Sequence, residues 1–141
     1  MDPRDFLEVA KKLSQGGTAA EYRTAVSRAY YAIYHVSADF LTGLGCTIND
    51  GPSGHGDVYR NLSNCCDSEL ASVGSQLHDL HGKRIIADYR LNNTKYDNQK
   101  TTQAVMMQSE RMIQALDRCV SGARRDEIAK AVKEYLRKIS P

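Results

Sequence analysis

The segment from Ser27 to Leu44, SRAYYAIYHVSADFLTGL, constrains the fold most, because it has the pattern of a long amphipathic helix with two distinct faces. Successive residues of an α-helix are rotated by about 100°, so side chains three or four positions apart lie on one face. One face carries a polar stripe made of Arg28, Tyr31, His35 and Asp39. The opposite face is a wide apolar arc that must pack against other helices, and its members are Tyr22, Val26, Ala29, Tyr30, Ile33, Phe40, Leu41 and Leu44.

Capping residues and glycines indicate where this helix and its neighbour begin and end. A first helix is expected from Pro3 to the glycine pair at 16–17. Thr18 and Glu21 have the spacing of a capping box, so the second helix is expected to start there. It runs for about 26 residues, or roughly 39 Å, to the glycines at 43 and 45.

The rest of the chain also has helical periodicity, separated by polar loops. Residues 47–57 are turn-forming and predict an exposed loop, and residues 92–100 predict another. Gly82 is a possible kink or interruption of the fourth helix. The expected later helices cover residues 58–64, 68–91, 105–120 and the segment from 122 onward. Since no strand pattern is present, the sequence predicts an all-α, single-domain antiparallel bundle of five to six helices over residues 1–141.

The composition is typical of one globular domain and does not identify a binding partner. The chain has 141 residues, of which 41% are hydrophobic and 26% charged. No apolar run approaches the roughly 18 residues that span a bilayer, and the first ten residues lack the order of a signal peptide, so a cytoplasmic protein without membrane contact is expected. The net charge of +2 does not by itself indicate nucleic acid.

The metal-binding residue types are not spaced as ligands. Four cysteines, which are Cys46, Cys65, Cys66 and Cys119, include no CxxC pair and have no matched histidine spacing. Reduced thiols are therefore expected. No acidic cluster suits magnesium either, so we predict neither a metal nor a cofactor.

Three segments resemble one known family. SRAYYAIYHVSADFL resembles the long second helix of HEPN domains, in the branch with an Arg-Ala-Tyr-Tyr-Ala run followed by His. GHGDVYRNL is similar to that branch's histidine-containing loop before a short third helix. LHDLHGKRIIADY is similar to its leucine-rich helix ending in Arg, three residues, Asp-Tyr. The resemblance covers about Ala25 to Tyr89 in the right order.

The resemblance implies a metal-independent ribonuclease that acts as a homodimer on RNA, as a toxin or defence effector. Such enzymes use an Arg and a His separated by four to six residues. Histidine can move a proton from a 2′-hydroxyl, and arginine can stabilise charge on the phosphorane. Arg28 and His35 have six residues between them and are the predicted catalytic pair. Tyr31 is expected to orient the substrate and Asp39 to orient His35.

A second candidate site lies in the later helix, where the best-known toxin branch has its pair. This chain has Arg84, Asp88 and Tyr89 there, with Asp in the place of His. A carboxylate is ionised at pH 7 and is an unsuitable partner for phosphate. Arg84 and Asp88 are one turn apart, which favours a partly buried ion pair that fixes helix packing.

The remaining histidines carry weaker signals. His55 lies in the glycine-rich loop, where a turn or helix-start role is favoured over contact with phosphate. His78 and His81 are expected to be surface and interhelical residues.

Two alternatives remain open at the level of sequence. The polar stripe can be a solvated face in which His35 is bonded to Asp39. The chain can also be a non-catalytic HEPN module that binds nucleotide, RNA or a partner nucleotidyltransferase, which the resemblance implies as an antitoxin.

Overall fold

A computed structural model describes residues 1–140 as a bundle of α-helices, and no strand is present in that range. This confirms the all-α prediction. The helices are α1 (Arg4–Ser14), α2 (Ala19–Gly43), α3 (Gly54–Ser63), α4 (Ser68–Tyr89), α5 (Gln99–Asp117) and α6 (Gly122–Ile139).

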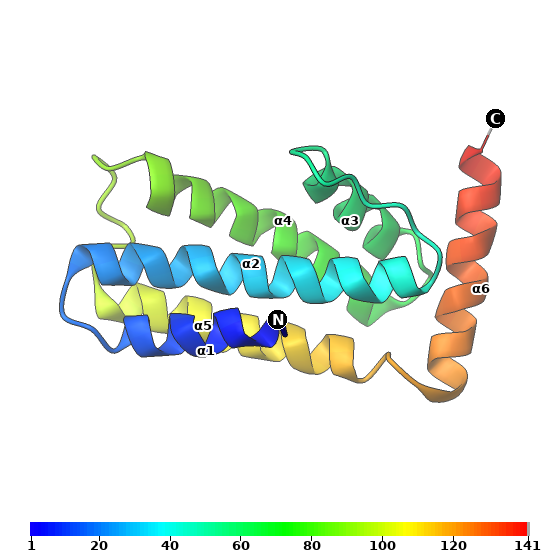
Figure 1. The fold of residues 1–141 in the computed structure, drawn as a ribbon, viewed down its shortest axis with the longest axis horizontal. Coiled ribbons are helices and arrows are strands. Elements are labelled where there is room, and N and C mark those ends of the chain that lie inside the picture. Colours follow the sequence, from blue (N-terminus) through cyan, green and yellow to red (C-terminus); the bar gives the residue numbers. More distant parts are fainter. Residues whose placement is uncertain (141) are drawn as a thin grey trace.

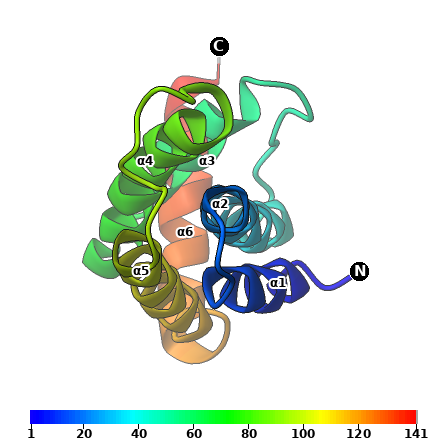
Figure 2. The same cartoon turned by 90° about the vertical axis from the view of Figure 1, so that its left-hand side faces the viewer.

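The long helix α2 is the centre of the bundle. It packs against α1, α3, α4 and α5, and an end-on view shows it between α1, α4 and α5 (Figure 2). Helix α3 lies beside the first half of α4, and α6 crosses one end of the bundle at a steep angle (Figure 1). Arg124 ties α6 to the start of α4 through ion pairs with Asp67 at 2.8 Å and Glu69 at 2.9 Å.

The predicted capping residues set the start of α2. The Glu21 amide donates to the Thr18 hydroxyl at 3.2 Å, and that hydroxyl donates to the Glu21 carboxylate at 2.8 Å. The helix has 25 residues, close to the expected length. It ends before Gly45, whose φ of +97° is in the left-handed region that glycine adopts without strain.

Two helices begin earlier than expected, and one possible interruption is absent. Helix α3 begins at Gly54 and not at 58, so His55 is in its first turn. Helix α4 continues through Gly82, as the expected range of 68–91 has it and without the interruption considered possible there, because a helical glycine costs only about 1 kcal/mol and neighbouring turns keep their hydrogen bonds. Helix α5 starts at Gln99, because the side chain of Asn98 accepts a hydrogen bond from the Thr101 amide at 2.9 Å.

The core confirms the apolar arc of α2. Tyr30, Ile33 and Leu41 are at most 1% exposed. Arg23 is also buried on α2, where it pairs with Asp97 at 2.5 Å. It donates to backbone carbonyls in the last turn of α4 and in the segment that follows it, those of Ile86, Ala87, Arg90, Leu91 and Asn93. Of the helices within residues 1–140, none has the length and apolar character needed to cross a membrane.

Candidate functional site

A cleft of about 410 Å³ opens between α2, the end of α4 and the loop before α3. We call it the central cleft. It contains residues of both predicted sites, and its lining is Tyr31, Tyr34, His35, Asp50, Gly51, Pro52, His55, Arg84 and Tyr89. Five of the eight predicted site residues therefore surround one hollow, although the sequence separated them into an early and a late site.

Arg84 is the buried cation of this cleft, with 9% of its surface exposed. Its Nη1 donates to the Tyr31 hydroxyl at 3.1 Å and lies 3.5 Å from Oδ2 of Asp88. The predicted partly buried ion pair is therefore present. Asp88 also accepts a hydrogen bond from the Ser27 hydroxyl at 3.0 Å, which joins α2 to α4. Nε of Arg84 is buried and has no acceptor among the described residues, so the protein does not use all the donors of this guanidinium.

Tyr31 lies next to two guanidinium groups. The Cζ atom of Arg28 is 4.9 Å from the Tyr31 ring centroid, and that of Arg84 is 5.3 Å from it. Arg28 also lies over the Phe6 ring at 5.1 Å, and it has no ion pair or hydrogen bond to another side chain within residues 1–140. An aromatic ring attracts a nearby cation through its quadrupole. The two rings therefore hold Arg28 in place and leave its donors free.

His35 contacts the same two rings as Arg28. Its imidazole centroid lies 6.1 Å from Phe6 and 6.2 Å from Tyr31. Arg28 and His35 thus share one face of α2, as the stripe predicts. Asp39 is exposed, and no hydrogen bond joins it to His35 in the part of the chain that the structure describes. The orienting role of Asp39 therefore stays a prediction. Both side chains line a separate hollow of about 270 Å³ with Met1, Pro3 and Phe6.

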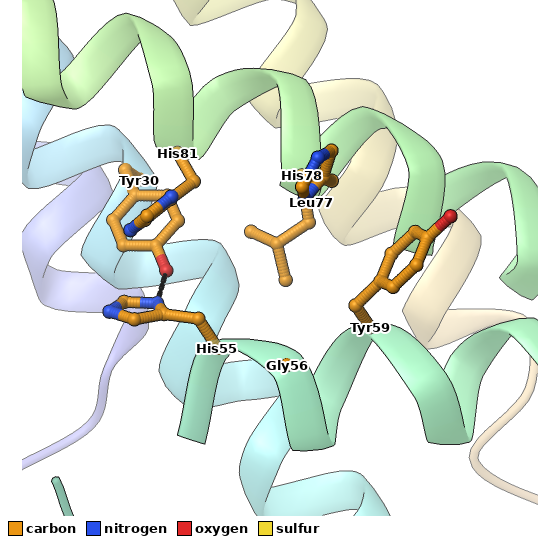
Figure 3. A pocket seen from close by; sticks show the side chains of 7 residues that line it. All are labelled: Tyr30, His55, Gly56, Tyr59, Leu77, His78 and His81. Carbon is orange, nitrogen blue, oxygen red and sulfur yellow. Dashed lines mark hydrogen bonds between the residues drawn. The ribbon is translucent and has the colours of Figure 1, made fainter. Parts of the chain in front are cut away.

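A histidine pair lies beside the central cleft. The imidazoles of His55 from α3 and His81 from α4 have centroids 4.2 Å apart, and Nδ1 of His55 is hydrogen-bonded to the hydroxyl of Tyr30 (Figure 3). Burial, with smaller contributions from His81 and Arg84, lowers the pKa of His55 to about 4. Burial also lowers the pKa of His81, and it raises the pKa of Tyr30. At pH 7 these histidines are neutral, so each carries one N–H donor and one nitrogen acceptor.

Sequence reasoning assigned these residues only in part. The interhelical position predicted for His81 is confirmed, but its contact with His55 was not foreseen. Tyr30 was assigned to the core, where it lies. Its hydroxyl is also hydrogen-bonded to Nδ1 of His55, which the sequence did not predict. A usable signal is the spacing of His81 and Arg84, because residues three apart share a helix face. Tyr89, which is 67% exposed, lies at the rim of the cleft.

Within residues 1–140, no three His, Cys, Asp or Glu side chains gather in an arrangement that could hold a metal ion. The four cysteines are free thiols, as expected, and three of them are buried. Comparisons of the chain with protein-family models, with curated proteins and with solved structures found no match.

Proposed function

We propose that this chain is a HEPN-like endoribonuclease that cleaves RNA in the central cleft without a metal ion. The observation that carries the proposal is that two imidazoles, His35 and His55, and the guanidinium of Arg84 line the same cleft. This set combines groups that can move protons with a cation that can bind a phosphate oxygen. The resemblance of residues 25–89 to HEPN domains points to the same chemistry.

The chemistry needs two proton transfers. In the proposed reaction, His55 takes the proton of the 2′-hydroxyl while the 2′-oxygen forms a bond to phosphorus. The bond from phosphorus to the 5′-oxygen breaks, and His35 gives that oxygen a proton, which leaves a 2′,3′-cyclic phosphate and a 5′-hydroxyl. His55 is neutral at pH 7 and can accept a proton. A bound phosphate raises its pKa from about 4, because a nearby negative charge favours the imidazolium.

Two arginines complete the proposed site. Arg84 faces the cleft. Arg28 also lies against the Tyr31 ring, and no carboxylate within residues 1–140 forms an ion pair with it. A planar guanidinium binds two phosphate oxygens at once and stabilises charge that develops in the transition state. Tyr31 and Tyr89 then supply rings for the bound RNA, since bases stack on tyrosine.

The proposal extends to partners. We propose a homodimer that acts on cytoplasmic RNA as a toxin or defence effector, and a nucleotidyltransferase as its antitoxin. A gene for a minimal nucleotidyltransferase beside the gene for this chain would support the pairing. Unrelated enzymes at that place would favour an accessory module.

The test is a cleavage assay on the purified protein with single-stranded RNA, with and without EDTA. We expect cleavage to persist in EDTA and to be abolished in His35→Ala, whose exposed side chain contributes little to packing. Arg28→Lys is expected to lose most activity, because an ammonium group cannot make the two-point contact. Arg137→Lys on α6 is the matched control and should cleave normally, since Arg137 pairs with Glu134 and lines neither the central cleft nor its neighbourhood on α2. Cleavage that survives in both site variants, or that stops with EDTA, would reject this site.

A second function is favoured by one observation, the carboxylates around Arg84. Asp88 lies 3.5 Å from its Nη1, and Asp50 lines the cleft. Both repel a phosphate and partly neutralise the cation. A non-catalytic module that binds nucleotide, RNA or a nucleotidyltransferase would tolerate them. Wild-type protein that binds RNA but leaves it intact would select this alternative.

A further inference from the structure

A second hollow of about 190 Å³ lies between α3 and α4, next to the central cleft (Figure 3). We call it the aromatic pocket. Its lining consists of Tyr30, His55, Gly56, Tyr59, Leu77, His78 and His81. Five of these seven residues have ring side chains, and none carries a carboxylate, an ammonium or a guanidinium. The pocket therefore suits an uncharged, flat group.

The rings stand at the two ends of the pocket. The imidazoles of His55 and His81 form one end in front of Tyr30, and Tyr59 from α3 forms the other (Figure 3). The Tyr59 ring contacts the imidazole of His78, and the two ring centroids are 5.1 Å apart. Leu77 projects between the two ends and is only 3% exposed, so it forms an apolar floor.

Gly56 adds no side chain to the α3 side of the pocket. A Cβ atom placed there would lie 2.9 Å from Nη1 at the end of the flexible Arg60 side chain. The resulting space is smaller than the 300–1,000 Å³ of sites that enclose drug-sized ligands. It has room for one ring system but not for a whole nucleotide with its sugar and phosphate.

The neutral imidazole of His81 matches the edge of a nucleobase. A base presents hydrogen-bond donors and acceptors along its edge and two apolar faces. An uncharged imidazole has one donor and one acceptor, and since Nδ1 of His55 is bonded to Tyr30, His81 is the histidine that offers both in the pocket. Tyrosine and histidine rings are the usual partners on which proteins stack bases. The lining therefore provides both kinds of contact that a base makes.

We propose that the aromatic pocket binds a nucleobase of the RNA whose phosphate occupies the central cleft. This inference rests on the proposed function, because it uses the cleft as the phosphate site. The two hollows share His55 as a lining residue, so they adjoin each other at that side chain. A nucleotide can then place its phosphate by Arg84 and His35 and its base between His81 and Tyr59. The pocket gives the enzyme a preference for single-stranded RNA, whose bases are free to turn outward.

The test compares ligands with and without a base. The probes are the four nucleoside 5′-monophosphates and ribose 5-phosphate, which carries the same sugar and phosphate but no base. Dissociation constants are measured by NMR titration of the full chain. We expect at least one nucleotide to bind about five- to a hundred-fold more tightly than ribose 5-phosphate, the range expected for one stacked base.

Variants at Tyr59 locate the base. Tyr59 is 38% exposed, so Tyr59→Ala is expected to fold. It should bring the affinity ratio between nucleotide and ribose 5-phosphate close to one. Tyr59→Phe keeps the ring and should keep the ratio. Tyr135→Ala removes a tyrosine of α6 that lines neither hollow and should also keep the ratio.

The outcomes separate the two proposals. Equal affinity for nucleotides and ribose 5-phosphate in the wild type, or a ratio that is unchanged in Tyr59→Ala, would overturn the base pocket even if RNA is cleaved. Absence of RNA cleavage would reject the nuclease, and a ratio lost only in Tyr59→Ala would still support the base pocket.

Discussion

Asp88 is the main departure from the ribonuclease pattern on which the proposed function rests, and its contacts give it a structural role. Its carboxylate accepts a hydrogen bond from Ser27 on α2 and pairs with Arg84 on its own helix. Arg84 in turn donates a hydrogen bond to the Tyr31 hydroxyl. Removing Asp88 would leave a nearly buried guanidinium with one weaker partner. The carboxylate therefore orders the cleft whether or not the cleft performs chemistry.

We predict that Asp88→Ala lowers the free energy of unfolding by about 1.5 to 3 kcal/mol, the range for a hydrogen bond to a charged group. The matched control is Asp79→Ala, because Asp79 pairs with Lys83 at the same spacing on the same helix but its side chain is 62% exposed. The control should cost less than about 0.5 kcal/mol. Urea denaturation measures both. If the two variants are equally stable and only Asp88→Ala loses activity or binding, then Asp88 has a functional role and not a structural one.

His55 gives the fold a dependence on pH. Its pKa is lowered to about 4 from 6.5 in the unfolded chain, chiefly by burial and also by His81 and Arg84. Between these values the unfolded state binds more protons than the folded state. The free energy of unfolding therefore falls as the pH is lowered from about 6.5 to about 4, and His81 contributes in the same direction.

We predict that His55→Gln reduces this loss of stability in acid, since glutamine does not titrate. The measurement is urea denaturation at a series of pH values from 4 to 7. His78→Gln is the control, because His78 is exposed and the full loss should remain. If the wild type and His55→Gln lose stability equally, the lowered pKa is not a property of His55.

At the residue scale, sequence reasoning found the individual side chains but not their neighbours. The periodicity of α2 placed Arg28, Tyr31 and His35 on one face, because a helix fixes which of its own residues are adjacent. Contacts between helices depend on how the helices pack, and one sequence does not fix that arrangement. The contact of His55 with His81 across α3 and α4 is of this kind.

Helix α4 shows how local and tertiary effects share control of an element. Its start was predictable, because Asp67 accepts a hydrogen bond from the Leu70 amide at 3.0 Å as an N-cap residue. Its continuation past Gly82 was expected with a kink or interruption there as a possibility, since glycine lowers helix propensity and tertiary packing decides whether the helix continues. The early start of α3 was missed, because Pro52 and the glycines of the preceding segment are typical of turns.

Two glycines of α4 allow a matched comparison. Gly82 is exposed, and a Cβ placed there would meet no atom within 4 Å beyond its own stretch of helix backbone, so we predict that Gly82→Ala raises the free energy of unfolding by about 0.5 to 1 kcal/mol. Gly74 is buried, and its Cβ would lie 3.0 Å from Cβ of Leu62. Gly74→Ala should therefore destabilise the fold by about 1 to 3 kcal/mol through overpacking. Thermal and urea denaturation show whether each substitution raises or lowers the free energy of unfolding. Stabilisation by both substitutions would mean that α3 and α4 do not pack closely.

At the scale of the whole molecule, the site depends on three segments that are distant in sequence. The long amphipathic helix, the glycine-rich loop and the end of α4 meet around the central cleft. The number of helices and the position of the core followed from periodicity and capping, which are local. The joining of the two predicted sites into one cleft required the bundle itself, because α2 and α4 must lie side by side for Tyr31 to reach Arg84.

The surface around the cleft also bears on assembly. Tyr89, at the cleft rim, is 67% exposed, and Leu91 just after the end of α4 is 70% exposed. Large exposed apolar side chains near a polar stripe are typical of an association surface. We predict a homodimer that forms through this face, so that each cleft lies close to the partner subunit.

Light scattering at micromolar concentration should give twice the mass of the chain. A twofold interface brings the same patch of both subunits together, so one substitution acts twice. Leu91→Asp would place two carboxylates in the interface and should yield monomers. Met107→Asp on α5 is the control, because Met107 is 58% exposed but lines no part of the cleft, and it should leave the dimer intact. A monomeric wild type across the accessible concentration range would remove the dimer together with any catalytic site that needs two subunits.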